Sequence, residues 1–121
     1  GPEVFMLRRH GNSDVLGGVY VFPGGKVDSD DHDDAMLDRV DTDRLTLHGA
    51  LNDQAIEPHH AAGYFVAACR ETFEECGVLL ARPTGCPVMY GGETQAAIAE
   101  RHRAAVHKSE RTMAEVAAVA F

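Results

Sequence analysis

The chain has 121 residues, with 11 basic and 19 acidic side chains and a formal net charge of −8. This length fits one domain with a modest core, and the acidic excess argues against a nonspecific nucleic-acid or membrane surface. No apolar run reaches the length of a membrane span. Cys69, Cys76 and Cys86 have neither zinc-site nor disulfide spacing, so we expect free thiols in a reducing, cytoplasmic compartment.

Two strands and a glycine turn are predicted near the N-terminus. Residues 3–9 alternate in character as a strand does, residues 10–18 contain turn-forming side chains, and residues 19–22 form a second apolar strand. This strand leads directly into Gly24 and Gly25. Adjacent glycines let the backbone approach a phosphate or offer a carbonyl to a metal ion without side-chain obstruction. The turn is therefore a candidate binding element.

The middle of the chain is predicted to contain one long helix. Residues 28–34 are rich in aspartate but lack the offsets of a calcium loop, so we expect a solvated loop or helix start rather than a second metal site. A short helix is predicted at 34–40, whereas 45–51 is ambiguous. Pro58 suits the first turn of the long helix, and Gly77 suits the position after its end.

The long helix carries three carboxylates on one stripe. Glu71, Glu74 and Glu75 lie at i, i+3 and i+4, so their charges repel unless something compensates them. A hard divalent cation with oxygen ligands is the natural compensator, and a solvated acidic face is the simpler alternative. The opposite, buried side is predicted from the spacing of Phe65, Cys69, Thr72, Phe73 and Cys76.

After this helix the chain is predicted to return as a short strand at 78–81, followed by a loop at 82–92. Residues 93–107 and 109–121 read as two helices, the second with Ser109 as its N-cap. The chain starts directly in a strand and stops inside an alanine-rich helical segment. We therefore expect a domain truncated at both ends.

The glycine pair and residues 70–78 (RETFEECGV) together resemble the Nudix box of the Nudix hydrolases. That box reads Gly, five residues, Glu, seven residues, Arg-Glu, an apolar residue, any residue, Glu-Glu, any residue, Gly and an apolar residue. The second half matches, except that Thr72 stands where an apolar residue is usual. Eight positions before Arg70 stands Ala62, so the first glutamate is missing there, and residues 29–57 are interpreted as an insertion inside the box.

Three residues near the start of the helix could substitute for that glutamate: Glu57, His59 and His60. The alternative for each is a solvated helix entry.

The long insertion is a feature of the coenzyme A diphosphatase-like branch of this family. The segment Leu7-Arg8-Arg9 and residues 18–25 (GVYVFPGG) also resemble the signature that precedes the box in that branch. The signature carries a second arginine where this chain has Asp14. The resemblance covers roughly residues 3–82.

The resemblance implies an α+β fold, the α/β/α Nudix sandwich, in which helices flank a mixed sheet, with residues 1–121 as a single domain. It implies divalent-metal-dependent hydrolysis of a diphosphate linkage, with coenzyme A or acyl-coenzyme A as the first substrate class. ADP-ribose or a dinucleotide is the alternative substrate. A non-catalytic nucleotide- or protein-binding module is the alternative function, which Ala62 and the expected truncation favour.

By the same resemblance, Mg²⁺ or Mn²⁺ is held by Glu71, Glu74, Glu75 and the backbone carbonyl of Gly25. Glu74 and Glu75 are the firmer ligands, and the catalytic residues are Glu71 and Glu75. Glu71 is either a ligand or the base for the attacking water, because a carboxylate does either according to its distance and pKa.

The resemblance further implies a small nucleotide as substrate, and its phosphates are expected to contact Arg8, Arg9, Gly24 and Lys26. Arg70 is interpreted as a structural residue that orients a box glutamate, with direct phosphate contact as the alternative. A homodimer remains open.

Overall fold

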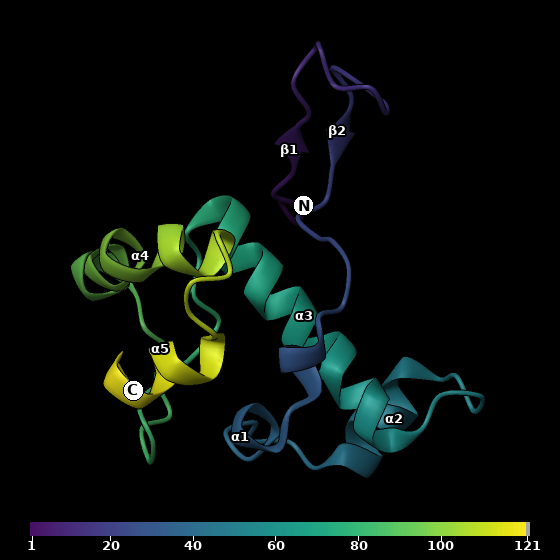
Figure 1. Cartoon of the computed structure of the whole chain (residues 1–121), viewed down its shortest axis with the longest axis vertical. Helices are drawn as coiled ribbons and strands as arrows, with labels where there is room; N and C mark the ends of the chain where they lie inside the picture. Colours follow the sequence, from purple (N-terminus) through teal and green to yellow (C-terminus); the bar gives the residue numbers. More distant parts are fainter. Residues whose placement is uncertain (121) are drawn as a thin grey trace.

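The computed structural model describes residues 1–120 as an α-dominated chain with one small antiparallel sheet, which confirms the α+β expectation at this coarse level (Figure 1). The elements in chain order are β1 (Leu7–Arg8), β2 (Tyr20–Val21), the 3₁₀ turn η1 (Ser29–His32), α1 (Asp34–Leu37), α2 (Arg44–Leu51), α3 (Pro58–Cys76), α4 (Gly92–His107) and α5 (Met113–Ala120).

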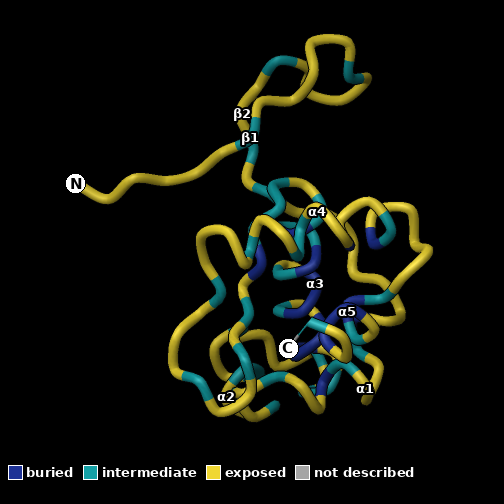
Figure 2. Tube along the Cα trace, turned by 90° about the vertical axis from the view of Figure 1, so that its left-hand side faces the viewer, coloured by how far each residue is buried: buried dark blue, intermediate teal, exposed yellow. Residues whose placement is uncertain are grey.

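Helix α3 is the central element, and the most deeply buried residues follow it (Figure 2). Pro58 occupies its first turn, where a missing N–H costs nothing. Gly77 ends the helix with a φ of 69°, a left-handed conformation that glycine adopts without strain. Both predicted helix boundaries are confirmed.

Two apolar clusters lie at opposite ends of α3. The cluster at its N-terminal half is formed by Leu37, Ala62 and Val66, with α1 and α2 packed beside it. The cluster at its C-terminal half joins α3 to α4 and α5. Its buried members are Phe73, Leu79, Val106, Met113 and Val116. Helix α3 therefore connects the two halves of the helical body.

The buried face of α3 differs from the predicted one. Of the five residues assigned to it, only Phe73 is buried, and the other four are partly exposed. The buried stripe instead includes Val66 and the charged Arg70, because α1 and η1 pack along that side. Neighbouring segments, rather than side-chain hydropathy alone, decide which face of this helix is covered.

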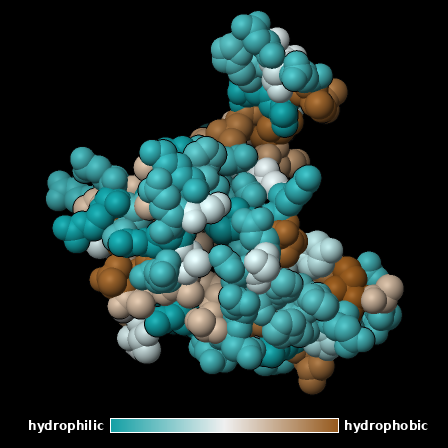
Figure 3. Space-filling model, viewed as in Figure 1, coloured by the Kyte–Doolittle hydropathy of each residue, from teal (hydrophilic) through white to brown (hydrophobic). Residues whose placement is uncertain are grey.

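The N-terminal hairpin projects from the helical body (Figures 1 and 3). Its strands pair antiparallel with Leu7 opposite Val21, and both are shorter than predicted. Large apolar side chains remain exposed on it, among them Phe5 at 64%, Tyr20 at 64% and Phe22 at 66%. A two-stranded hairpin is marginally stable in water unless its apolar side chains are packed, and these side chains are not packed here.

The segment after α3 does not form the predicted strand. Its backbone groups bond elsewhere: the Leu79 N–H donates to Gln95 Oε1 at 3.1 Å, and the Ala81 carbonyl accepts from the Tyr90 N–H at 2.9 Å. The only sheet of the described residues pairs β1 with β2, so residues 78–81 belong to no strand.

The last helix starts later than predicted. Ser109 has a φ of 57° and lies in the turn before it, so it is not the N-cap. Thr112 performs that role, because its Oγ1 accepts from the Glu115 N–H at 3.2 Å while Glu115 Oε2 accepts from the Thr112 N–H at 2.7 Å. The predicted end of this helix at Phe121 lies outside the described residues.

The helices of the insertion and α4 agree more closely with the elements predicted from the sequence. A helix forms at Asp34–Leu37, the ambiguous segment is helical as α2, and α4 covers the predicted 93–107. Asp43 caps α2 by accepting from the Thr46 N–H at 2.9 Å. All three cysteines are free thiols, and none of the helices within residues 1–120 has both the length and the apolar character needed to cross a bilayer.

Gly63 tests the close packing of η1 on α3. A Cβ at this position would lie 2.9 Å from His32 Cβ, whereas a Cβ at Gly49 in α2 would meet nothing within 4 Å. We expect Gly63→Ala to lower the free energy of unfolding by about 1–3 kcal/mol through overpacking. Gly49→Ala should raise it by about 0.5–1 kcal/mol through helix propensity. Chemical denaturation measures both, and a stabilising Gly63→Ala would contradict this contact.

Candidate functional site

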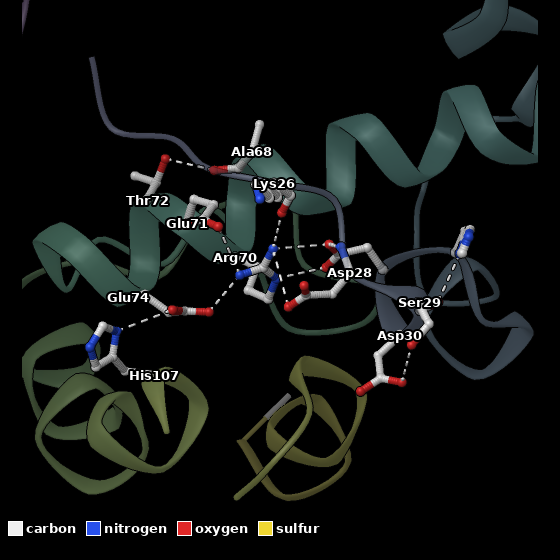
Figure 4. Close-up of polar contacts among 12 residues, drawn as sticks. Lys26, Asp28, Ser29, Asp30, Ala68, Arg70, Glu71, Thr72, Glu74 and His107 are labelled. Carbon is white, nitrogen blue, oxygen red and sulfur yellow. Dashed lines mark hydrogen bonds and ion pairs between the residues drawn. The ribbon is translucent and has the colours of Figure 1, made fainter. Parts of the chain in front are cut away.

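A single buried guanidinium organises the site (Figure 4). The Arg70 side chain is 9% exposed and donates from Nε and Nη2 to the two Asp31 oxygens at 2.9 and 3.1 Å. Its Nη1 donates to Glu74 at 2.7 Å and to Glu71 at 3.1 Å, and Nη2 also donates to the Lys26 carbonyl at 2.8 Å. These bonds fix the side-chain direction of two predicted site glutamates, which is the structural role assigned to Arg70.

Burial alone would lower the pKa of Arg70. The hydrogen bonds that it donates to Asp31 and Glu74 outweigh that effect and hold the pKa above its usual value. The protonated guanidinium is therefore favoured by its acidic partners in spite of its burial.

Asp31 is the residue that the sequence prediction missed. It lies in a run expected to be solvated, yet it is 2% exposed, and its Oδ2 also accepts the Asp28 N–H at 2.8 Å. Ala62, where the first box glutamate was sought, packs instead with Leu37 and Val66. Five residues separate Gly25 from Asp31, so counting forward from the glycine would have found the acidic partner of the arginine.

The three proposed substitutes for that glutamate lie elsewhere. Glu57 precedes the first turn of α3, while the rings of His59 and His60 pack on each other and on His32 with centroids 5.1–5.8 Å apart. His59 Nδ1 also lies 3.2 Å from Arg44 Nη1. In the part of the chain that the structure describes, none of the three hydrogen-bonds to the central guanidinium.

The glycine turn lies against the carboxylate face of α3. The Gly24 N–H donates to Glu75 Oε2 at 3.1 Å, across 51 positions of sequence. A Cβ on Gly25 would overlap the Glu71 carboxylate, so only glycine permits this approach without displacing that side chain. The glycine turn and the glutamate stripe of α3 therefore lie side by side, although residues 29–57 separate them in the sequence.

Negative charge exceeds positive charge at this site. Four carboxylates lie within 4 Å of the Arg70 guanidinium, those of Asp28, Asp31, Glu71 and Glu74. Burial raises the pKa of Glu71, and the nearby Glu74 and Glu75 charges add to this although Arg70 opposes it. The arrangement leaves anionic charge that a hard cation would offset.

The oxygen donors differ in their availability. Glu74 uses Oε1 for Arg70, and its Oε2 lies 3.3 Å from His107 Nδ1, so it is the most engaged of the three glutamates. Glu71, the exposed Glu75 and the Gly25 backbone would need less rearrangement to hold a divalent ion. No three histidine, cysteine or acidic side chains within residues 1–120 already converge on one metal position.

A cleft of about 840 Å³ lies beside these carboxylates, between the hairpin and helices α3 and α4. Three of the predicted substrate residues line it: Arg8, Arg9 and Gly24. Lys26 does not, and it contributes its carbonyl to Arg70 instead. Arg8 Nε donates to the Gly18 carbonyl at 3.3 Å and Arg9 Nη2 to Ser13 Oγ at 3.2 Å, which hold both arginines at the cleft edge.

Helix α4 supplies cleft residues that the sequence did not indicate. Arg103 and His107 line the cleft together with Glu74 and Glu75. Arg103 donates to both glutamate backbone carbonyls at 2.6 Å and so binds the last turn of α3. Nothing in the sequence separates Arg103 from Arg101 on the same helix, since only the crossing of α4 over α3 distinguishes them.

No protein-family model matches the chain, and no solved structure is significantly similar to it. The site is therefore interpreted from its own residues.

Replacing Asp31 tests the buried ion pair. Asp31→Asn should lower the free energy of unfolding by about 2–3 kcal/mol, less than a fully broken buried pair, because Glu71 and Glu74 still neutralise Arg70. The exposed neighbour Asp30 is the control, and Asp30→Asn should change stability by less than about 0.5 kcal/mol. Equal effects in urea titrations would contradict the role of Asp31.

Glu71 predicts an unusual pH dependence in the metal-free protein. Because its folded-state pKa is raised above 4.5, its ionisation opposes folding, and this cost is present above the folded-state pKa and vanishes as the pH falls below 4.5. Glu71→Gln should therefore raise the melting temperature at pH 7 in EDTA, with the gain shrinking as the pH falls through 4.5. Glu110→Gln in an exposed turn is the control and should show no such gain. A destabilised Glu71→Gln at pH 7 would contradict the charge excess.

Proposed function

We propose that this chain is a divalent-metal-dependent diphosphatase of the Nudix type, which hydrolyses a diphosphate linkage in a nucleoside diphosphate derivative. The observation that carries the proposal is the approach of the Gly24-Gly25 turn to Glu71 and Glu75. Two segments distant in sequence thus bring a glycine backbone beside two carboxylates, and Gly24 and Glu75 of this group line one cleft. Cleavage of a phosphoanhydride needs such a set, because the dianionic bridge repels nucleophiles until cationic charge offsets it.

The position of Asp31 adds to the motif. With Gly25, five residues and Asp31, the first half of the box regains an acidic residue, an aspartate in place of glutamate. Its bidentate contact to Arg70 links that half to the second half. On this interpretation the spacer between Asp31 and Arg70 is expanded to residues 32–69, and no catalytic position of the motif is missing.

We also propose the α/β/α sandwich as the complete fold, with the β1–β2 hairpin belonging to its mixed sheet and α3 as the box helix. The exposed apolar side chains of the hairpin support this part, because a packed layer over the sheet would bury Phe5, Tyr20 and Phe22.

Mg²⁺ or Mn²⁺, held by Glu71, Glu75 and the Gly25 carbonyl with Glu74 as a further ligand, would supply cationic charge for the phosphate oxygens. Arg70 keeps Glu71 and Glu74 in position through its two Nη1 bonds. The Glu75 carboxylate accepts a hydrogen bond only from the Gly24 N–H among the described residues, so its second oxygen remains for a ligand or for the attacking water. Glu71 serves either as a ligand or as the base that accepts a proton from that water.

Coenzyme A or acyl-coenzyme A is the first substrate class that we propose, with ADP-ribose or a dinucleotide as the alternative. The volume of the cleft, about 840 Å³, admits a molecule of nucleotide size, and Arg8 and Arg9 line it where phosphate groups would lie.

A non-catalytic nucleotide-binding module is the second candidate. One observation favours it: both Glu74 oxygens are engaged by protein groups, and no three metal-binding side chains converge within residues 1–120.

The test compares Glu75→Gln with Glu100→Gln, an exposed glutamate that lines the same cleft from α4. With Mg²⁺ or Mn²⁺, a panel of coenzyme A, ADP-ribose and a dinucleotide is assayed and the product masses are identified. We expect Glu75→Gln to lose on the order of 10²-fold in kcat, Glu100→Gln to keep its rate within a few-fold, and EDTA to abolish turnover. Turnover that survives EDTA would exclude the metal-dependent mechanism. Nucleotide binding without any turnover would favour the non-catalytic module.

A further inference from the structure

Arg103 on α4 has a guanidinium that the protein holds only in part. Its Nε and Nη2 donate to the Glu74 and Glu75 backbone carbonyls, each at 2.6 Å. Its Nη1 has no hydrogen-bond partner among the described residues. Two hydrogen bonds to a helix end immobilise the guanidinium. Ligand binding to Nη1 therefore costs little further entropy of the Arg103 side chain.

Arg103 also has no carboxylate partner. Within residues 1–120 only Arg44, Arg70 and Arg82 among the arginines have a carboxylate within 4 Å, so Arg103 shares this property with the other arginines of the cleft, Arg8 and Arg9. Its two acceptors are neutral carbonyls, although the negative end of the α3 dipole lies there. In a chain with 19 acidic residues, a fixed cation without an acidic partner is available to an external anion.

Arg103 lies where its charge can act on a ligand in the cleft. It lines the same cleft as Arg8 and Arg9, which come from the hairpin, whereas Arg103 comes from α4. The three cations thus border one cavity from two separate elements. An anion with more than one phosphate group matches such an arrangement better than a single carboxylate does.

We propose that Arg103 is a substrate-binding residue of the cleft, and that its Nη1 contacts a phosphate group of a diphosphate-bearing ligand. This inference rests on the proposed function and extends it, because it assigns a phosphate contact to α4 beyond the box and the hairpin. The cap on α3 and the phosphate contact use different nitrogens, so Arg103 can make both at once.

Replacing Arg103 by glutamine distinguishes its role as a cap on α3 from its role as a phosphate contact. Arg103→Gln retains an N–H donor for a helix carbonyl but loses the charge. Arg101→Gln is the matched control, because it removes the same charge from an exposed position of the same helix that does not line the cleft. Arg103→Lys keeps the charge while losing the two-carbonyl cap.

The measurement is calorimetric titration of the full chain with methylenediphosphonate, which cannot be hydrolysed, in the presence of Mg²⁺, together with the melting temperature of each variant. We expect about tenfold weaker binding for Arg103→Gln and less than about twofold for Arg101→Gln, as for one charge-assisted hydrogen bond. Arg103→Lys should recover part of the affinity whatever its melting temperature.

Unchanged binding by a folded Arg103→Gln would overturn the inference. So would affinities that follow the melting temperatures of the glutamine and lysine variants, since Arg103 would then act only as a helix cap. Wild-type binding that Arg103→Gln weakens, without turnover of any nucleotide, would uphold this phosphate contact and reject the diphosphatase. If the wild-type chain hydrolyses a nucleotide normally and Arg103→Gln binds methylenediphosphonate as tightly as the wild type does, the diphosphatase is upheld and the phosphate contact of Arg103 is rejected.

Discussion

The arrangement of the site depends on the burial of the Arg70 charge. A guanidinium that is 9% exposed must satisfy its donors within the protein, and it recruits Asp31 from η1, Glu71 and Glu74 from α3, and the Lys26 carbonyl. Nη1 and Nη2 each have two acceptors, whereas Nε bonds Asp31 alone, so removing Asp31 leaves a donor unpaired in a poorly solvated place. The glycine turn, the 3₁₀ turn and the helix are therefore fixed relative to one another by one side chain.

The Arg70 network contains more carboxylates than cations. The position of its glutamates at the C-terminal end of α3 adds to the electrostatic repulsion among them. Glu71, Glu74 and Glu75 lie in the last two turns of α3, where the helix dipole already places negative charge. Arg103 offsets part of it at the terminal carbonyls, yet burial still raises the pKa of Glu71. A fold that maintains such an excess gives up stability, which is typical of a site prepared for a positively charged ligand.

The local rules of helix and turn formation made part of this structure predictable. Pro58 and Gly77 fixed the ends of α3, and the spacing of the glutamates placed them on one stripe. The burial of Asp31 was not predictable from its neighbours in sequence, because an aspartate-rich run is solvated unless a distant arginine packs against it. The strand predicted at 78–81 did not form, and the contact of Arg103 with the end of α3 was not predicted, for the same reason: both depend on where α4 crosses α3.

Residues 29–57, interpreted from the sequence as an insertion, have a structural role that their composition conceals. The η1 turn at the start of this segment places Asp31 against Arg70, so Asp31 joins the site, while His32 packs on Gly63 of α3. Helices α1 and α2 then cover the N-terminal half of α3 around Leu37 and Val66. The inserted residues thus brace the turn that carries Asp31, and through it the glutamates. A segment that lengthens the motif in sequence need not separate its parts in space, because loop closure costs only a few tenths of a kcal/mol more for each modest increase in length.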